Sequence, residues 1–289
     1  MITGFINVWK PPQGSSAKLV SSVKKITGEQ TGHMGTLDPM AEGVLPVCVG
    51  RAGRLFDYLL DKKKVYVAEF AFGKETDTLD VTGQVIKTTD VVPTVEQIQK
   101  VLPSLTGDVM QVPPNYSAKS VGGVRGYQLA RQGKEFTLPP KKVTIDCIEL
   151  LGQTAENTYR FRITAGGGTY VRSIGRDIGY ACGSLGTMTS LVREQSGPFV
   201  RENACTVEQL SIGDWKSRLI PADTVVSFPK VHLDADGAHR LLCGLPHLVD
   251  KADGLYRVYA PNEFFGIGVV QEGKMKMKSY LRTEIYADI

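Results

Sequence analysis

The pattern of apolar and polar positions predicts several β-strands. β-rich apolar runs at residues 2–9 and 65–72 are typical of strands, and residues 83–88 are expected to pair with the second of these runs. Residues 143–151 and 158–164 form two further runs on either side of a short polar turn, which predicts a hairpin. The strands do not alternate regularly with helices, so repeated strand–helix–strand units are not expected.

Three segments show helical spacing or helix-end signals. Residues 15–27 begin with two serines that can cap a helix, and Gly28 provides its stop. Residues 94–97 form a capping box for a short helix that Pro103 ends. Apolar residues spaced by three and four positions predict another helix over residues 170–181.

These elements predict an α+β fold around a mixed, mostly antiparallel central sheet. The pattern changes towards the C-terminus, where residues 236–243 predict a short helix and residues 256–280 predict short strands with glycine turns. We therefore expect two domains, a large one over residues 1–226 and a small β-rich one over residues 227–289.

Composition excludes several classes of protein. Hydrophobic residues make up 42% and charged residues 22% of the 289 residues, as in ordinary globular proteins. No apolar run approaches the 18 residues of a membrane span, and the first residues lack the features of a signal peptide, so we expect a cytoplasmic protein without a membrane. Five distant cysteines without a C-x-x-C pair and four histidines without an H-E-x-x-H motif give no indication of a metal site.

The net charge of +4 is mild, but its distribution is uneven. Residues 107–142 contain six basic and two acidic residues, whereas residues 227–289 carry eight of each. Tyr116, Tyr127 and Phe136 lie among the basic residues of the first segment. Interleaved basic and aromatic residues suit contact with phosphates and bases, although an ordinary solvated loop has the same composition.

The candidate chemistry lies in residues 32–46, which read GHMGTLDPMAEGVLP. The glycines permit tight turns and close approach of the backbone to a ligand. Asp38 precedes a proline and therefore favours an extended conformation, which would present its carboxylate on a loop. An Asp-Pro pair between glycines would by itself indicate only a turn.

The full string resembles the G-H-x-G-T-L-D-P-x-A-x-G-x-L signature of the TruB family of tRNA pseudouridine synthases. Four further runs are similar to motifs of this family, namely residues 74–83 (KETDTLDVTG), 111–118 (QVPPNYSA), 168–173 (GTYVRS) and 191–199 (LVREQSGPF). The resemblance covers residues 2 to about 225. It is weaker beyond them, where the family carries a small RNA-binding PUA domain.

The resemblance implies an isomerase that needs no cofactor and acts on uridine 55 in the TΨC loop of tRNA. It assigns Asp38 as the catalytic carboxylate, while covalent attack and deprotonation of the sugar remain open alternatives. A buried carboxylate needs a cationic partner to stay ionised, and Arg172 is expected to form a fork-to-fork pair with it.

The other implied site residues contact the substrate. Tyr66 would face the base and accept or relay a proton, and Tyr170 and Leu191 would line the pocket. His33 would fill the gap that a flipped-out base leaves in the RNA. Lys10 would either reach a phosphate or hold the first loop.

We expect tRNA as the partner, bound through its T-arm, elbow and acceptor stem, with residues 107–142 as a basic clamp. A monomer without an obligate protein partner is expected. Four positions depart from the family pattern and put secondary RNA contacts in doubt, namely Gln13, Gly53, Gly167 and Glu194.

Three other functions remain to be weighed. A tRNA-binding chaperone would need no chemistry, and a guide-RNA-dependent synthase subunit would need a second RNA. An unrelated hydrolase with an Asp nucleophile would require a second carboxylate or histidine beside Asp38, and the sequence offers no convincing one.

Overall fold

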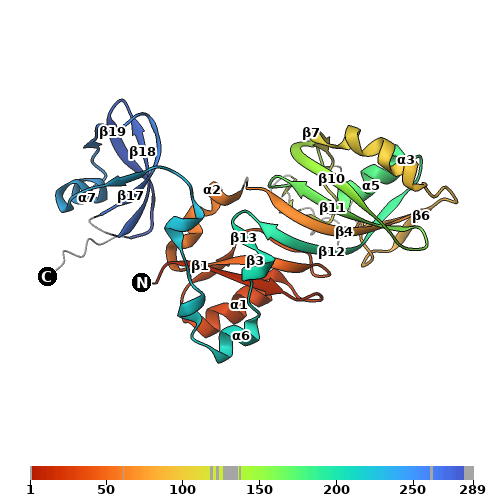
Figure 1. Cartoon of the computed structure of the whole chain (residues 1–289), viewed down its shortest axis with the longest axis horizontal. Helices are drawn as coiled ribbons and strands as arrows, with labels where there is room; N and C mark the ends of the chain where they lie inside the picture. The colour runs from red at the N-terminus through yellow and green to blue at the C-terminus, as the bar shows by residue number, and fades with distance from the viewer. Residues whose placement is uncertain are drawn as a thin grey trace.

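The computed structural model describes residues 2–60, 62–117, 120–121, 124–125, 136, 138–260 and 263–282. A ten-stranded sheet and a five-stranded sheet carry most of its strands (Figure 1). Short helices cover the larger sheet, so the predicted α+β class is confirmed. No helix in the described part of the chain is long and apolar enough to cross a membrane.

The large sheet has the strand order β14-β1-β3-β12-β4-β11-β10-β7, with β2 added to β3 and β13 added to β12. Its strands are β1 (Gly4–Lys10), β2 (Thr31–His33), β3 (Glu42–Val49), β4 (Lys64–Phe72), β7 (Gly107–Gln111), β10 (Lys141–Ala155), β11 (Thr158–Ala165), β12 (Gly186–Ser196), β13 (Phe199–Val200) and β14 (Ile220–Pro221). Among the described strands of this sheet, only β3 and β12 pair in parallel, which confirms a mixed, mostly antiparallel sheet.

The predicted hairpin is confirmed as β10 and β11, but the predicted pairing of residues 83–88 is wrong. Strand β4 lies between β11 and β12, so both of its edges are occupied by long strands. Residues Val85–Thr88 instead form β6, which pairs with β5 (Lys74–Thr76) in a separate two-stranded sheet. All four side chains of β6 are exposed, so this strand has no apolar face that a place in the central sheet would bury.

The described residues form six α-helices, of which four were predicted and two, at residues 56–60 and 207–212, were not. They are α1 (Ser16–Thr27), α2 (Phe56–Leu60), α3 (Val95–Val101), α5 (Val171–Ala181), α6 (Val207–Ile212) and α7 (Ala235–Leu242). The Ser15 hydroxyl accepts a hydrogen bond from the Lys18 backbone at the start of α1, and Gly28 ends the helix with a φ of 71°. Both hydrogen bonds of the capping box at Thr94 are present.

Short 3₁₀ helices connect several of these elements. They are η1 (Gly50–Leu55), η2 (Leu102–Leu105), η3 (Arg201–Asn203), η4 (Trp215–Arg218) and η5 (Ala222–Val225).

Helix α5 packs unusually closely against the large sheet. A Cβ atom at Gly175 would lie 2.3 Å from the Phe70 ring, and one at Gly186 would lie 2.2 Å from the Gly175 carbonyl oxygen. Side chains at these two positions would therefore force the helix away from β4 and β12. The close approach brings the first turn of α5 to the middle of the sheet.

The five-stranded sheet has the order β15-β17-β18-β19-β16 and lies at one end of the molecule, at the left in Figure 1. Its strands are β15 (Lys230–His232), β16 (His247–Leu248), β17 (Gly254–Tyr259), β18 (Phe264–Gln271) and β19 (Lys274–Tyr280). Ile267 and Leu281 share an apolar cluster with Leu55 of η1, and the Tyr259 hydroxyl donates to Asp223 at 2.8 Å. The expected division at residue 226 falls between η5 and β15, and we keep it as a proposal.

The basic segment 107–142 is only partly described. It begins in β7 and ends in β10, which pair with each other, so both of its ends belong to the central sheet. β8 (Ser120–Val121) and β9 (Val124–Arg125) form a short pair within it. Lys119, Arg131 and Lys134, on which the predicted clamp partly rests, lie outside the described residues.

Candidate active site

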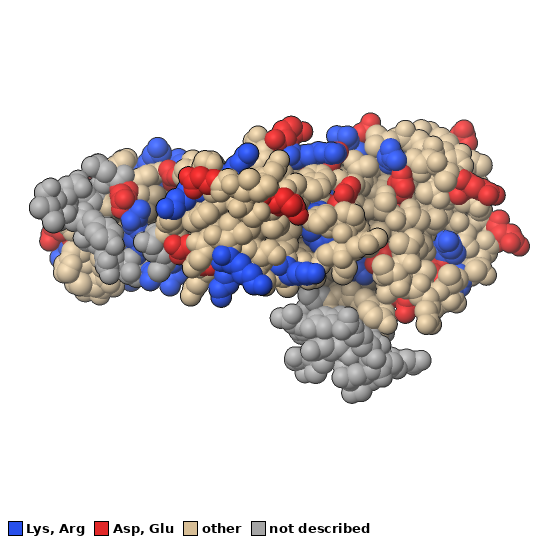
Figure 2. All heavy atoms as spheres, turned by 90° about the horizontal axis from the view of Figure 1, so that it is seen from below, with Lys and Arg blue, Asp and Glu red and all other residues tan. Residues whose placement is uncertain are grey.

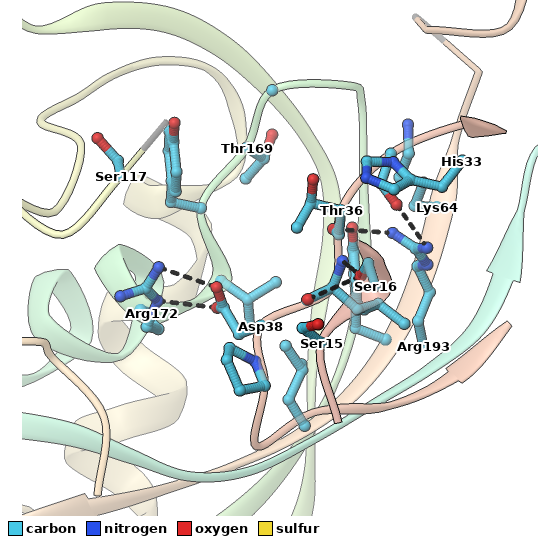
Figure 3. Close-up of a pocket in the computed structure, with 18 of the residues that line it drawn as sticks. Ser15, Ser16, His33, Thr36, Asp38, Lys64, Ser117, Thr169, Arg172 and Arg193 are labelled. Atoms are coloured by element: carbon cyan, nitrogen blue, oxygen red, sulfur yellow. Dashed lines mark hydrogen bonds and ion pairs between the residues drawn. The ribbon is translucent and has the colours of Figure 1, made fainter. Parts of the chain in front are cut away.

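A cavity of about 650 Å³ lies between the residue 34–41 loop, the first turn of α5 and strands β4 and β12. Six of the seven residues singled out from the sequence line it, namely His33, Asp38, Tyr66, Tyr170, Arg172 and Leu191. Segments that lie up to 158 residues apart in the sequence therefore meet in one cavity. Figure 3 shows how the polar side chains face its interior.

Asp38 and Arg172 form a bidentate ion pair in this cavity (Figure 3). The Arg172 Nε lies 2.9 Å from Asp38 Oδ2, and a terminal guanidinium nitrogen donates to Asp38 Oδ1 at 3.1 Å. The Arg172 side chain is only 7% exposed, whereas that of Asp38 is 31% exposed. The pair thus holds the carboxylate in a fixed orientation and leaves one face of it open to the cavity.

Arg172 is itself fixed by further contacts. It donates to the carbonyl oxygens of Thr78 and Tyr116, and a terminal nitrogen lies 3.6 Å from Asp80 Oδ2. Asp80 is buried and accepts hydrogen bonds from the hydroxyls of Thr78 and Thr82. Asp80 is therefore a second carboxylate near Asp38, which sequence reasoning did not find, and its oxygens are occupied by these contacts.

Opposing effects act on the Asp38 carboxyl. Burial raises the pKa of Asp38 above its ordinary value, the Arg172 guanidinium lowers it, and the negative charge of Asp80 raises it again. The net direction is upward. Arg172 thus limits a rise that burial alone would make larger.

Three anchors hold the loop that carries Asp38. The Ser16 hydroxyl of α1 exchanges hydrogen bonds of 3.0 Å with both backbone groups of Leu37. The Lys10 ammonium group donates to the carbonyl oxygens of Pro39 and Ala41, at 3.1 and 2.6 Å. Arg193 of β12 donates to the carbonyl oxygens of Gly35 and Thr36, which precede Asp38 in the loop. The backbone on both sides of Asp38 is thus fixed.

Lys10 does not line the cavity. Its side chain is fully buried in β1, and all three hydrogen bonds of its ammonium group go to backbone carbonyls of the first loop and the Asp38 loop. Of the two roles expected for Lys10, the structure fits the one of holding a loop. A phosphate contact is wrong, because no part of the side chain reaches the surface.

Arg193 belongs to the family-like motif of residues 191–199, but the sequence did not indicate a role for it. It is 1% exposed and donates to the carbonyl oxygens of Val44 at 2.8 Å, Gly35 at 3.0 Å and Thr36 at 3.5 Å. Its backbone also requires glycine at position 43, since a Cβ atom there would lie 2.3 Å from the Arg193 carbonyl oxygen. The glycine thus permits the parallel pairing of β3 with β12.

The other predicted site residues that line the cavity come from β4, β12, β2 and the start of α5. Tyr66 of β4 and Leu191 of β12 are nearly buried and form an apolar wall. The backbone of Tyr170 exchanges two hydrogen bonds with the Gln111 side chain, which fixes the start of α5 to β7. His33 of β2 lies at the rim beside Arg193, and burial lowers the pKa of its imidazole. A neutral imidazole at neutral pH follows.

The donor set does not suggest a metal centre. Within the described ranges, no group of three His, Cys, Asp or Glu side chains is placed to hold a metal ion. The cavity instead combines one oriented carboxylate with aromatic and aliphatic walls. Such a site can hold a flat ring beside a carboxylate that acts as a nucleophile or a base.

Comparison with known protein families identifies one match. The model of the TruB family pseudouridylate synthase N-terminal domain matches residues 23–171. The tRNA pseudouridine synthase B of Caldanaerobacter subterraneus subsp. tengcongensis is 38% identical over 282 residues, which cover 96% of this chain and 98% of that protein. The tRNA pseudouridine synthase B of Francisella philomiragia subsp. philomiragia is 35% identical, with coverage of 99% and 97%.

Several solved structures share the fold. The structure of a Cbf5-Nop10-Gar1 complex contains a chain with a TM-score of 0.72 and 25% identity, covering 99% of this chain and 87% of that one. A chain in an H/ACA RNP bound to a substrate RNA containing 2'-deoxyuridine has the same TM-score and 22% identity, with coverage of 98% and 87%. Both similarities extend over the large and the small sheet.

Proposed function

The chain belongs to the TruB family of pseudouridylate synthases, and from this premise we propose that it isomerises uridine 55 in the TΨC loop of tRNA, with Asp38 as the catalytic carboxylate. The observation that carries the proposal is the bidentate Asp38–Arg172 pair at the cavity. This pair orients the Asp38 carboxylate and leaves one side of it accessible from the cavity. The two relatives described above match over nearly their whole length, and both are named tRNA pseudouridine synthase B.

The reaction breaks the C1'–N1 bond of uridine and joins C1' to C5 of the same base. Atoms are rearranged without oxidation, so the chemistry requires no redox group. Asp38 can attack C1' or remove a proton from the sugar, and either step requires its ionised form. Arg172 orients the carboxylate and offsets part of the effect of burial.

The walls of the cavity suit a detached uracil. Tyr66, Tyr170 and Leu191 offer aromatic and aliphatic surfaces against which a flat ring can pack. A base inside a folded RNA loop must first be extruded, which costs a few kcal/mol. We propose that His33, which lines the cavity, stacks in this gap, where stacking worth about 1–3 kcal/mol per base would offset much of this cost.

The charge distribution supports contact with tRNA. On the face shown in Figure 2, Lys and Arg side chains are frequent between the small sheet and the middle of the molecule, where some acidic side chains lie among them, and acidic side chains are also frequent at the opposite end. A basic surface attracts the phosphate backbone without reading sequence. We propose that the small sheet contacts the acceptor stem and that the basic segment 107–142 contacts the T-arm and elbow. A monomer remains the expected state.

Mapping pseudouridine in an unmodified tRNA transcript tests this function. We expect one new pseudouridine at position 55 with the purified chain alone, and none in a transcript with cytidine at that position. Binding without modification would favour the tRNA chaperone. Modification only after addition of a guide RNA would favour a guide-dependent subunit.

The pH dependence of kcat/KM provides a second test. The rate should fall on acidification with a midpoint above the ordinary Asp pKa, because burial raises the pKa of Asp38 and only the carboxylate reacts. In Asp80→Asn the midpoint should fall, since the charge of Asp80 contributes to the increase. Circular dichroism identifies the pH range in which both proteins stay folded. A midpoint that stays unchanged in Asp80→Asn would contradict this electrostatic account.

A further inference from the structure

Arg193 is an unusual residue at this site because its charge is fully buried and lacks an acidic partner. Three of its hydrogen bonds go to backbone carbonyl oxygens, and its side chain also interacts with the Tyr66 hydroxyl. Among the described residues, no carboxylate forms an ion pair with it, whereas Arg172 has two. Burying a cation without an anion is costly. Such a group stabilises any negative charge that forms beside it.

A group that can become negative lies opposite Arg193, namely the hydroxyl of Tyr66. Arg193 and Tyr66 are direct partners on the antiparallel strands β12 and β4, where opposite Cβ atoms lie about 5 Å apart. Both side chains line the same cavity. The strand pairing is irregular between Arg193 and Gln195, and bulges of this kind re-aim side chains beside active sites.

The electrostatics of the pair agree with this geometry. Burial raises the pKa of the Tyr66 hydroxyl, so the resting residue is a neutral phenol, and the Arg193 guanidinium acts in the opposite direction. The phenol is therefore kept protonated at rest, and its anion is stabilised when it forms. A proton carrier requires both properties.

On the basis of the proposed function, we propose that Arg193 is a positioning residue that stabilises the phenolate of Tyr66 during the last proton transfer of the isomerisation. After C1' is joined to C5, this carbon still carries its hydrogen, and N1 is doubly bonded to C6. Tyr66 donates its hydroxyl proton to N1 and becomes a phenolate. The phenolate then takes the C5 proton, the C5–H electron pair forms the C5=C6 bond, and the C6–N1 bond becomes single. Tyr66 returns to its neutral form.

Single-turnover kinetics with tRNA carrying hydrogen or deuterium at uridine C5 test this role. In Arg193→Lys and Arg193→Met, we expect the rate to fall by about 10²- to 10³-fold, as when one preorganised electrostatic group is lost. The C5 deuterium isotope effect should exceed that of the native protein, because C5 proton removal becomes slower relative to the other steps. The affinity for tRNA should stay within about twofold.

Arg172→Lys is the matched control, because it weakens the Asp38 pair in the same cavity and leaves Tyr66 and Arg193 in place. Its rate should fall without an increase in the isotope effect. A slow Arg193 variant with the native isotope effect would overturn the proposal. If the native protein itself makes no pseudouridine, the proposed function fails, which is a different result.

Titration of the Tyr66 hydroxyl does not depend on activity. It therefore tests the proposal even where a substitution lowers activity by altering the fold. 3-Fluorotyrosine at position 66 permits titration of this hydroxyl alone by ¹⁹F NMR. The midpoint should be higher in Arg193→Met than with the native arginine, because the cation favours the phenolate. An unchanged midpoint in a folded variant would overturn the proposal.

Discussion

Asp38→Asn should abolish catalysis and leave the protein folded. The amide has nearly the same shape but cannot act as a nucleophile or base, so kcat should fall by at least about 10⁴-fold, as when a central catalytic group is lost from other enzymes. Arg172 keeps its contacts with Asp80 and the Thr78 carbonyl oxygen, so no buried cation is left unpaired. Nucleoside analysis of the tRNA product measures the loss.

Binding of tRNA distinguishes this result from unfolding. Asp38→Asn should bind the unmodified transcript with native affinity in a filter-binding assay at fixed salt, because most contacts to RNA come from elsewhere on the surface. Asp177→Asn is a matched control, since this carboxylate pairs with Arg176 on α5 outside the cavity. It should retain most of the activity. Substantial turnover by Asp38→Asn would exclude Asp38 as the catalytic group.

Arg172→Met should lose both stability and activity. The substitution leaves the carboxylates of Asp38 and Asp80 without their shared cation, and breaking a buried pair in this way costs about 3–5 kcal/mol. Burial then raises the pKa of Asp38 without opposition from Arg172, and the orientation of the carboxylate is lost. The rate should fall by about 10³-fold. Urea denaturation and kcat/KM measure the two effects separately.

Arg160→Met is the matched control for the stability effect. Arg160 pairs with Glu69 at 2.7 Å on the sheet, but its side chain is 50% exposed. An exposed pair contributes less than about 1 kcal/mol, so this variant should be nearly as stable and as active as the native protein. A similar loss of stability in both variants would show that the buried contacts of Arg172 contribute no more to the free energy of unfolding than an exposed ion pair does.

Local signals in the sequence predicted the elements around the site well. The serine cap and Gly28 fixed the ends of α1, and the capping box fixed the start of α3, because these signals act over four residues or fewer. The partner strand of β6 was predicted wrongly, because apolar content predicts a strand but not the strand with which it pairs. Pairing depends on which edges of the sheet are already occupied.

Contacts within the site were harder to predict. Asp38 and Arg172 lie 134 residues apart in sequence, so only the family motifs and the need for a counter-charge pointed to their pairing. The sequence left two roles open for Lys10, because lysine is rarely buried and its burial here depends on carbonyl groups that only the folded loop brings together. Asp80 and Arg193 lay in recognised motifs, but Asp80 contacts Arg172 of α5 and Arg193 contacts the β3 strand, and both partners are distant in sequence.

The most direct test of the account is tritium release from an unmodified tRNA transcript labelled at uridine C5, with the native chain alone and Asp38→Ala as the comparison. Pseudouridine formation must remove the hydrogen at C5. We predict release by the native chain without a guide RNA and none by the variant. No release by the native chain while it still binds the transcript, or equal release by both proteins, would contradict the account.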